Sequence, residues 1–229
     1  MTRETAVTVA AAWLAFITGL LAGGEIRDFA SFAIASATGA VLVVLGFAAA
    51  LRCRTLPRRS NVRRTRLALL SLGAGMVLGI ANLGANVMIA EAHPQFRALL
   101  GERTATLAPV VGVVASPLVE EIAVRLFLMS TMAWIVLRLT KRAALAFAIA
   151  LLGSSLVFAL LHLARPMPAD SMLANYYRAA LLTKYTLAGL PLGWVFWRWG
   201  LPYAILCHVA ANAAHLALQE GVFNPVPRF

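Results

Sequence analysis

Two adjacent carboxylates, Glu120 and Glu121, lie inside a long apolar run, and Arg125 follows them on the same segment. An ionised side chain at membrane depth is costly unless it is paired or hydrated, so this placement indicates a function. Glu121 and Arg125 are one helical turn apart and are expected to pair. Glu120 lies roughly 100° further around the helix. It therefore remains available as a general base that activates water.

Two more polar motifs follow on later apolar segments. Phe158 and His162 are one turn apart at the end of one segment, where His162 can position a water molecule or share a proton with Glu120. In the last segment His208 and Asn212 are also one turn apart. Both side chains can donate a hydrogen bond to the same oxygen, which suits the stabilisation of an oxyanion. Together an acid, a histidine and an oxyanion-type pair can hydrolyse an amide through an activated water.

Each motif also has a structural interpretation. The glutamates can pair with Arg125 and Lys184 to lock helices together, and the histidine at the helix end can be an interface residue. The His-Asn pair can form hydrogen bonds that hold neighbouring helices together. His215 lies on the same face as that pair and is either a supporting residue or a contact to a neighbouring helix. Three polar clusters on three apolar segments are not expected if each cluster only stabilises helix packing on its own, so we favour the chemical interpretation.

The composition is typical of a membrane protein. Of the 229 residues, 61% are hydrophobic and 13% are charged. Several apolar segments reach the ~20 residues that cross a bilayer as a helix. The alternation typical of membrane strands is missing. The predicted fold is therefore all-α, a polytopic transmembrane helical bundle, with residues 1–229 as a single membrane domain and a catalytic core at about 107–219.

We predict about seven spans, at 6–21, 29–51, 67–90, 107–139, 143–163, 177–197 and 203–219. The segment from Leu107 to Leu139 is longer than one perpendicular span and gives an eighth span if it splits. Pro117 is expected to start or kink the helix that carries the glutamates. If it starts that helix, both acids lie in the first turns, where the helix dipole stabilises negative charge.

The charge distribution predicts the topology. The formal net charge is +11, but seven arginines fall between Arg52 and Arg66 in one connection. This pattern is typical of a short cytoplasmic loop and argues against nucleic-acid binding. The N-terminus is then cytoplasmic, and Glu120 and His162 lie toward the outer half of the bundle. By the same count His208 lies nearer the inner half, which agrees poorly with a shared site.

The ordered set Glu-Glu-x-x-x-Arg, Phe-x-x-x-His and His-x-x-x-Asn resembles the CAAX prenyl endopeptidase and bacteriocin-processing (CPBP, ABI-type) family of glutamic intramembrane proteases. The resemblance covers roughly residues 117–215. Glu121 and Arg125 match the supporting positions of the motif. Leu126 follows the motif arginine, where many family members have a glycine.

The resemblance implies a role for each motif residue. Glu120 would activate the hydrolytic water and His162 would help to position it. His208 and Asn212 would bind the oxyanion of the tetrahedral intermediate. The substrate would be a membrane-associated protein or peptide, namely a prenylated C-terminal tail, a bacteriocin leader peptide or a C-terminal anchor. The expected location is the cell (inner) membrane of a bacterium, and the sequence does not indicate an oligomeric state.

Two alternatives stay open at this point. One is a zinc peptidase with His162, His208 and a glutamate as ligands. The sequence lacks His-Glu-x-x-His, so we predict neither a metal nor another cofactor. The other alternative is a noncatalytic membrane protein, either an immunity or scaffold factor or a small transporter. Transporters often carry inverted repeats, and no repeat is visible in this chain.

Overall fold

The computed structural model describes residues 3–22, 29–53, 64–97, 109–163 and 171–223. Its helices are α1 (Arg3–Ala22), α2 (Phe29–Cys53), α3 (Arg64–Ala92), α5 (Pro109–Glu120), the π-helix η2 (Glu121–Met129), α6 (Ser130–Thr140), α7 (Ala143–Leu161), α8 (Ser171–Trp199) and α9 (Leu201–Phe223). The described residues contain no strand, which confirms the all-α prediction. Most of the predicted arginine loop, and the predicted span start at Leu107, lie outside the described residues.

Each predicted span corresponds to a helix or to a continuous helical run. Among the described residues, five segments are long and apolar enough to cross a membrane: Ala33–Cys53, Arg64–Ala92, Val113–Thr140, Ala143–Leu161 and Leu201–Gln219. The apolar run of α1, Thr8–Thr18, is shorter, and α8 is not among the five. Large apolar side chains also face outward, as in Val77 (68% exposed), Leu139 (79%) and Met172 (82%), which is expected of a surface covered by lipid.

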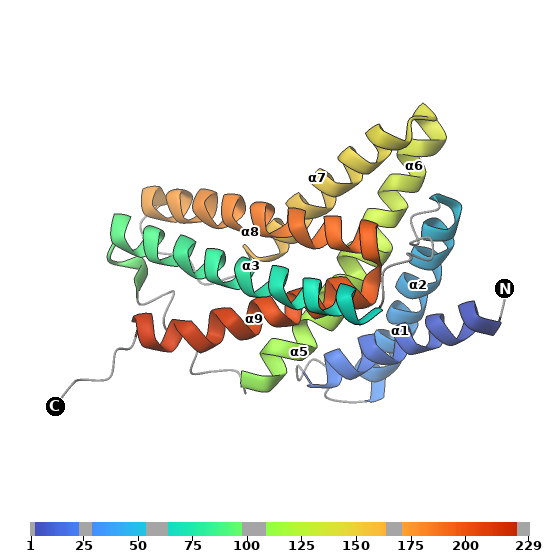
Figure 1. Ribbon diagram of the computed structural model, residues 1–229, viewed down its shortest axis with the longest axis horizontal. Helices are drawn as coiled ribbons and strands as arrows, with labels where there is room; N and C mark the ends of the chain where they lie inside the picture. The colour runs from blue at the N-terminus through green and yellow to red at the C-terminus, as the bar shows by residue number, and fades with distance from the viewer. Residues whose placement is uncertain (1–2, 23–28, 54–63, 98–108, 164–170, 224–229) are drawn as a thin grey trace.

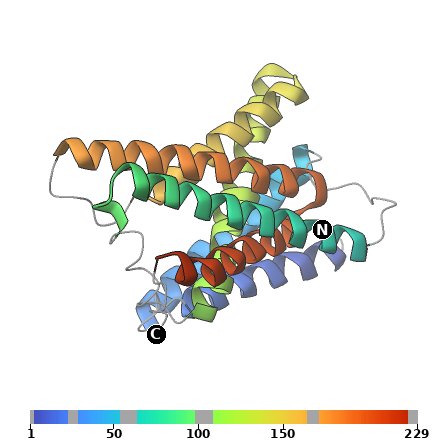
Figure 2. The same ribbon diagram turned by 60° about the vertical axis from the view of Figure 1, so that its left-hand side comes forward.

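The helices fall into two sets that cross at steep angles (Figures 1 and 2). In both views α3, α8 and α9 run lengthwise along the molecule, and the run from α5 to α6 passes across them. The α6–α7 hairpin projects from one side of the body. η2 lies at the centre and contacts α2, α7, α8 and α9. The glutamate segment is therefore surrounded by helices from both halves of the chain.

The helices α3 and α9 pack closely and run in parallel. Gly75 lies against the carbonyl of Cys207, and Gly79 lies against the carbonyl of Ala211. A Cβ atom at either glycine would overlap these backbone atoms, so only glycine permits this approach. The spacing of four residues on both helices is the small-residue pattern of close packing in membranes. It fixes the position of α9, which carries His208.

Of the two expectations for Pro117, that it starts or that it kinks the glutamate helix, the first is wrong and the second stays a prediction. The helix already runs from Pro109, and Pro117 lies inside α5. Proline lacks the amide hydrogen that bonds to the preceding turn, and the helix changes to π geometry four residues later. Both acids therefore lie in the middle of a continuous run from Pro109 to Thr140, which in the described residues does not split into two spans. The dipole at the N-terminal end of this run does not stabilise the two glutamates, because they lie more than two turns after its first residue, Pro109.

Candidate active site

The predicted pair of Glu121 and Arg125 is present in η2. Arg125 Nε lies 3.5 Å from Glu121 Oε2, and the two side chains are 0% and 1% exposed. Arg125 also donates from Nη1 to Ser154 Oγ on α7, at 3.5 Å. Its guanidinium lies 5.1 Å from the centre of the Phe158 ring. A buried charge needs such partners, so the arginine anchors Glu121 against α7.

His208 on α9 lies against both glutamates. Its Nδ1 is 2.9 Å from Glu121 Oε1, and its Nε2 is 3.7 Å from Glu120 Oε2. A carboxylate only accepts hydrogen bonds, so Nδ1 carries a hydrogen and donates it to Glu121. In the neutral ring Nε2 then holds the lone pair, and it faces the side of Glu120. Glu121 thus joins η2 to α9 and orients the histidine.

Glu120, the last residue of α5, has two different carboxylate oxygens. Oε1 accepts a hydrogen bond from Ser116 Oγ one turn earlier. Oε2 is buried and accepts no hydrogen bond from the described residues, although the side chain as a whole is 24% exposed. Glu121 Oε2 also accepts no hydrogen bond from the described residues, but it faces the Arg125 guanidinium at 3.5 Å. Glu120 Oε2 faces His208 instead, and an unsatisfied buried oxygen in this position suggests a water molecule or a catalytic role. The sequence analysis missed Ser116, whose only signal is its spacing of four residues from Glu120.

The predicted separation in depth between His208 and Glu120 is wrong, because the two side chains meet. The prediction counted residues along spans that stand parallel. In the structure α9 and the run from α5 to α6 cross steeply (Figure 1). His208 of α9 contacts Glu120 and Glu121, which belong to that run. We define the acid cluster as Glu120, Glu121, Arg125 and His208.

His162 lies at the end of α7 within a group of aromatic rings. Its Nδ1 donates to the carbonyl of Phe158 at 2.8 Å, so Nε2 is the nitrogen that carries the lone pair in the neutral ring. The ring of His162 stacks on Tyr185 of α8, with centroids 4.2 Å apart. Phe158 contacts His162 at 4.5 Å and His208 at 5.9 Å between centroids. Phe158 therefore lies between His162 and His208, and it links His162 to the acid cluster.

The α9 face beyond His208 carries Asn212, which is half-buried, and His215. His215 Nε2 lies 3.4 Å from Asn86 Nδ2 on α3, and Asn86 Oδ1 accepts from Lys184 Nζ on α8 at 2.6 Å. Ammonium only donates, so it fixes the orientation of the amide, and the amide in turn donates to His215. We define the amide cluster as Asn86, Lys184 and His215. His215 is thus a contact to a neighbouring helix, one of the two expectations for it.

Leu126 follows the motif arginine, at the position where many family members have a glycine, and the structure shows how this larger side chain is accommodated. Leu126 is fully buried, and Gly46 of α2 lies against it. A Cβ atom at Gly46 would come within 2.7 Å of the Leu126 carbonyl oxygen and 3.0 Å of its Cγ. The small residue is therefore on α2, and it permits α2 to pack against η2.

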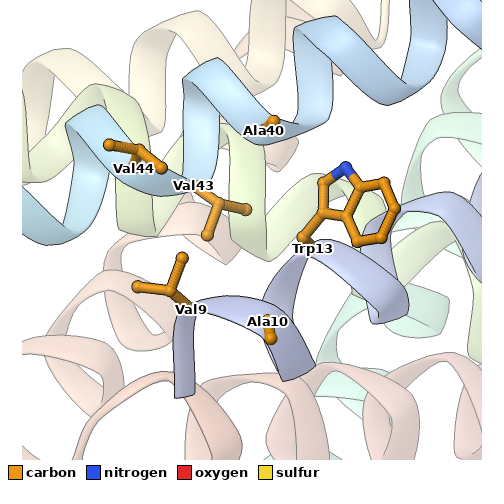
Figure 3. A pocket seen from close by; sticks show the side chains of 6 residues that line it. All are labelled: Val9, Ala10, Trp13, Ala40, Val43 and Val44. Atoms are coloured by element: carbon orange, nitrogen blue, oxygen red, sulfur yellow. The ribbon is translucent and has the colours of Figure 1, made fainter. Parts of the chain in front are cut away.

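A separate pocket of about 210 Å³ lies between α1 and α2 (Figure 3). It is lined by Val9, Ala10, Trp13, Ala40, Val43 and Val44. Its lining contains no acid or histidine, so the candidate chemistry is not there. Within the described residues, no group of three or more His, Cys, Asp or Glu side chains is arranged to hold a metal ion.

Residues 102–214 match the family model described as Rce1-like, Type II CAAX prenyl endopeptidase Rce1-like. The matched segment includes the acid cluster, His162 and Asn212, and it ends before His215. No curated protein and no solved structure matches the chain.

Proposed function

Because residues 102–214 carry a domain of the type II CAAX prenyl endopeptidase family, as the motifs predicted, we propose that the chain is a glutamic intramembrane endopeptidase. The family supports a membrane-embedded hydrolase that acts on a peptide or protein. The finer proposal is that Glu120 activates the hydrolytic water and that no metal takes part. The bacterial inner membrane and the cytoplasmic N-terminus belong to this proposal, and the orientation is supported by the arginines between Arg52 and Arg66.

The observation that carries the proposal is the position of Glu120 Oε2. It is buried, it has no hydrogen-bond donor among the described residues, and His208 Nε2 lies 3.7 Å away. That separation is too long for a direct hydrogen bond, so Oε2 keeps the lone pairs with which it would accept a hydrogen bond from the hydrolytic water. A carboxylate within hydrogen-bond reach of a water can accept its proton as a general base.

The reaction would proceed in two steps. Glu120 takes a proton from the water while the water oxygen bonds to the carbonyl carbon of the scissile peptide, which gives a tetrahedral oxyanion. His208 and Asn212, one turn apart on α9, would donate hydrogen bonds to this oxygen, with His208 donating from Nε2 in its imidazolium form, in which both ring nitrogens carry a hydrogen. Glu120 then gives its proton to the departing nitrogen as the carbon–nitrogen bond breaks, which leaves a carboxylic acid and an amine and returns Glu120 to its carboxylate form.

The remaining motif residues would support this chemistry. Glu121 accepts from His208 Nδ1, so it orients the ring toward Glu120. Arg125 balances the charge of Glu121 inside the bundle. His162, held by the Phe158 carbonyl and by Tyr185, would help to position the water. The substrate class, whether a prenylated tail, a leader peptide or a C-terminal anchor, stays a proposal.

The proposal is tested by comparing membrane-protein termini in cells that express wild type, Glu120→Gln or Glu91→Gln. Glu91 is an exposed acid on α3 and serves as a matched control. We expect a set of new termini in wild type and Glu91→Gln that is absent in Glu120→Gln, with equal amounts of inserted protein. The same termini in all three strains would overturn the proposal.

A chelator tests the metal-independent step separately. Purified wild-type protein should cleave a peptide that spans one of these termini at an unchanged rate after treatment with a zinc chelator. Loss of the rate on chelation and its return with added zinc would contradict the glutamic mechanism and favour the zinc alternative.

A further inference from the structure

Ser116 differs from other hydroxyl residues of the helices in what it bonds. A serine or threonine within a helix commonly donates to a backbone carbonyl of the preceding turn. Ser71 does so to Leu67 at 2.8 Å, and Thr140 does so to Val136 at 2.8 Å. Ser116 instead donates forward to the Glu120 carboxylate. Its hydroxyl therefore serves a side chain of the candidate site.

This hydrogen bond makes the two oxygens of Glu120 unequal. Ser116 and Glu120 are one turn apart on α5, so the serine can hold Oε1 without movement of the backbone. With Oε1 held, Oε2 points to His208 Nε2. A carboxylate without this contact could turn about its last bond, because such torsions have broad minima. The serine hydroxyl thus selects the oxygen that faces the histidine.

We propose that Ser116 is a positioning residue that fixes the Glu120 carboxylate so that Oε2 accepts the proton of the hydrolytic water. This inference rests on the proposed function of Glu120. The serine contacts neither the water nor the scissile bond, so it acts through the carboxylate. Glu120 is 24% exposed as a side chain, and Ser116 is the hydrogen-bond donor to its carboxylate among the described residues.

The experiment uses the full-length protein in liposomes and a fluorogenic peptide that spans a terminus identified by the comparison above. Ser116→Ala removes the hydroxyl, and Ser116→Thr retains it. Ser71→Ala is the matched control, because its buried hydroxyl bonds only to backbone. Both kcat and KM are measured for each variant, together with the melting temperature.

For Ser116→Ala we expect kcat to fall about tenfold to a hundredfold, since a hydrogen bond to a charged group is lost, while KM stays within about twofold. Ser116→Thr should recover kcat to within about threefold of wild type. Ser71→Ala should leave kcat unchanged. A merely structural role would instead lower the melting temperature without a selective loss of kcat.

Two results would overturn the inference: a wild-type kcat in Ser116→Ala, or an equal loss in Ser116→Ala and Ser116→Thr. A Glu120→Gln sample in the same assay separates this failure from failure of the proposed function. If Glu120→Gln is inactive and Ser116→Ala is normal, only the serine inference fails. If Glu120→Gln cleaves at the wild-type rate, the proposed function itself fails.

Discussion

The acid cluster and the amide cluster are both polar groups buried among apolar helices, but their hydrogen bonding differs. In the amide cluster Lys184 donates to Asn86 at 2.6 Å, and the amide then donates toward His215. Each step defines the orientation of the next group. In the acid cluster Glu120 Oε2 has no donor among the described residues and faces His208 Nε2 across 3.7 Å.

This difference suggests that the two clusters have different tasks. A hydrogen-bonded chain across α3, α8 and α9 joins three helices and is expected to hold them together. A buried carboxylate oxygen without a hydrogen-bond donor lowers stability, and such a cost is typical of a functional site. We therefore expect substitutions in the amide cluster to affect folding and substitutions of Glu120 to affect cleavage. Glu121 should affect both, because it joins Arg125 to His208.

The largest effect on stability is expected for Glu121→Gln. The neutral amide leaves the buried Arg125 guanidinium without its carboxylate, which costs about 3–5 kcal/mol. It also weakens the contact that orients His208, so cleavage should be lost as well. Thermal unfolding in detergent and the amount of inserted protein measure this change. A normal melting temperature would show that Glu121 does not anchor the cluster, and the division of roles between the two acids would be wrong.

A smaller loss of stability is expected for Asn86→Leu. Leucine removes the acceptor of the Lys184 hydrogen bond and the donor to His215, which costs about 2–3 kcal/mol for a bond to a charged group. Denaturant or thermal unfolding reports the loss. The protein that remains folded should retain kcat, because the acid cluster is untouched. A variant with wild-type stability and no cleavage would assign the amide cluster to the chemistry.

The smallest of these effects on stability is expected for Gly75→Ala. This variant tests the close packing of α3 against α9, the helix that carries His208. The new Cβ would overlap the carbonyl of Cys207, the residue before His208, and overpacking of this kind costs about 1–3 kcal/mol. Gly73→Ala is the control, since no atom of the described residues lies within 4 Å of its added Cβ. We expect the control to melt at or slightly above the wild-type temperature, since alanine favours a helix. Equal melting temperatures for the two variants would contradict the close packing.

The sequence predicts the fold well because each membrane-spanning helix needs a continuous apolar segment of about 20 residues, which is visible in the sequence. Each of the seven predicted ranges corresponds to a helix or a continuous run, and within the described residues the ends differ by at most six residues, at the start of α8. The pairing of Glu121 with Arg125 also follows from spacing alone, because both residues lie on one helix. Contacts within a single helix are thus predictable from the order of residues.

Contacts between helices are not predictable in this way, because they depend on crossing angles. Counting along parallel spans separated His208 from Glu120, whereas the steep crossing of α9 and α5 brings them together. Asn86 and Ser116 were overlooked, since a lone amide or hydroxyl in an apolar run is usually a packing residue. Nothing in the sequence predicts the change to π geometry at Glu121, because the amide hydrogen that Pro117 lacks would bond to Val113 in the turn before the proline.

The central claim is that cleavage depends on Glu120 and that folding depends on Asn86. The most direct test measures kcat and the melting temperature of Glu120→Gln and Asn86→Leu side by side in the same liposomes. For Glu120→Gln we expect cleavage to fall by about a thousandfold or more with an unchanged melting temperature. For Asn86→Leu we expect a lower melting temperature with cleavage retained per folded molecule. Retained cleavage in Glu120→Gln, or its loss in a stable Asn86→Leu, would contradict the claim.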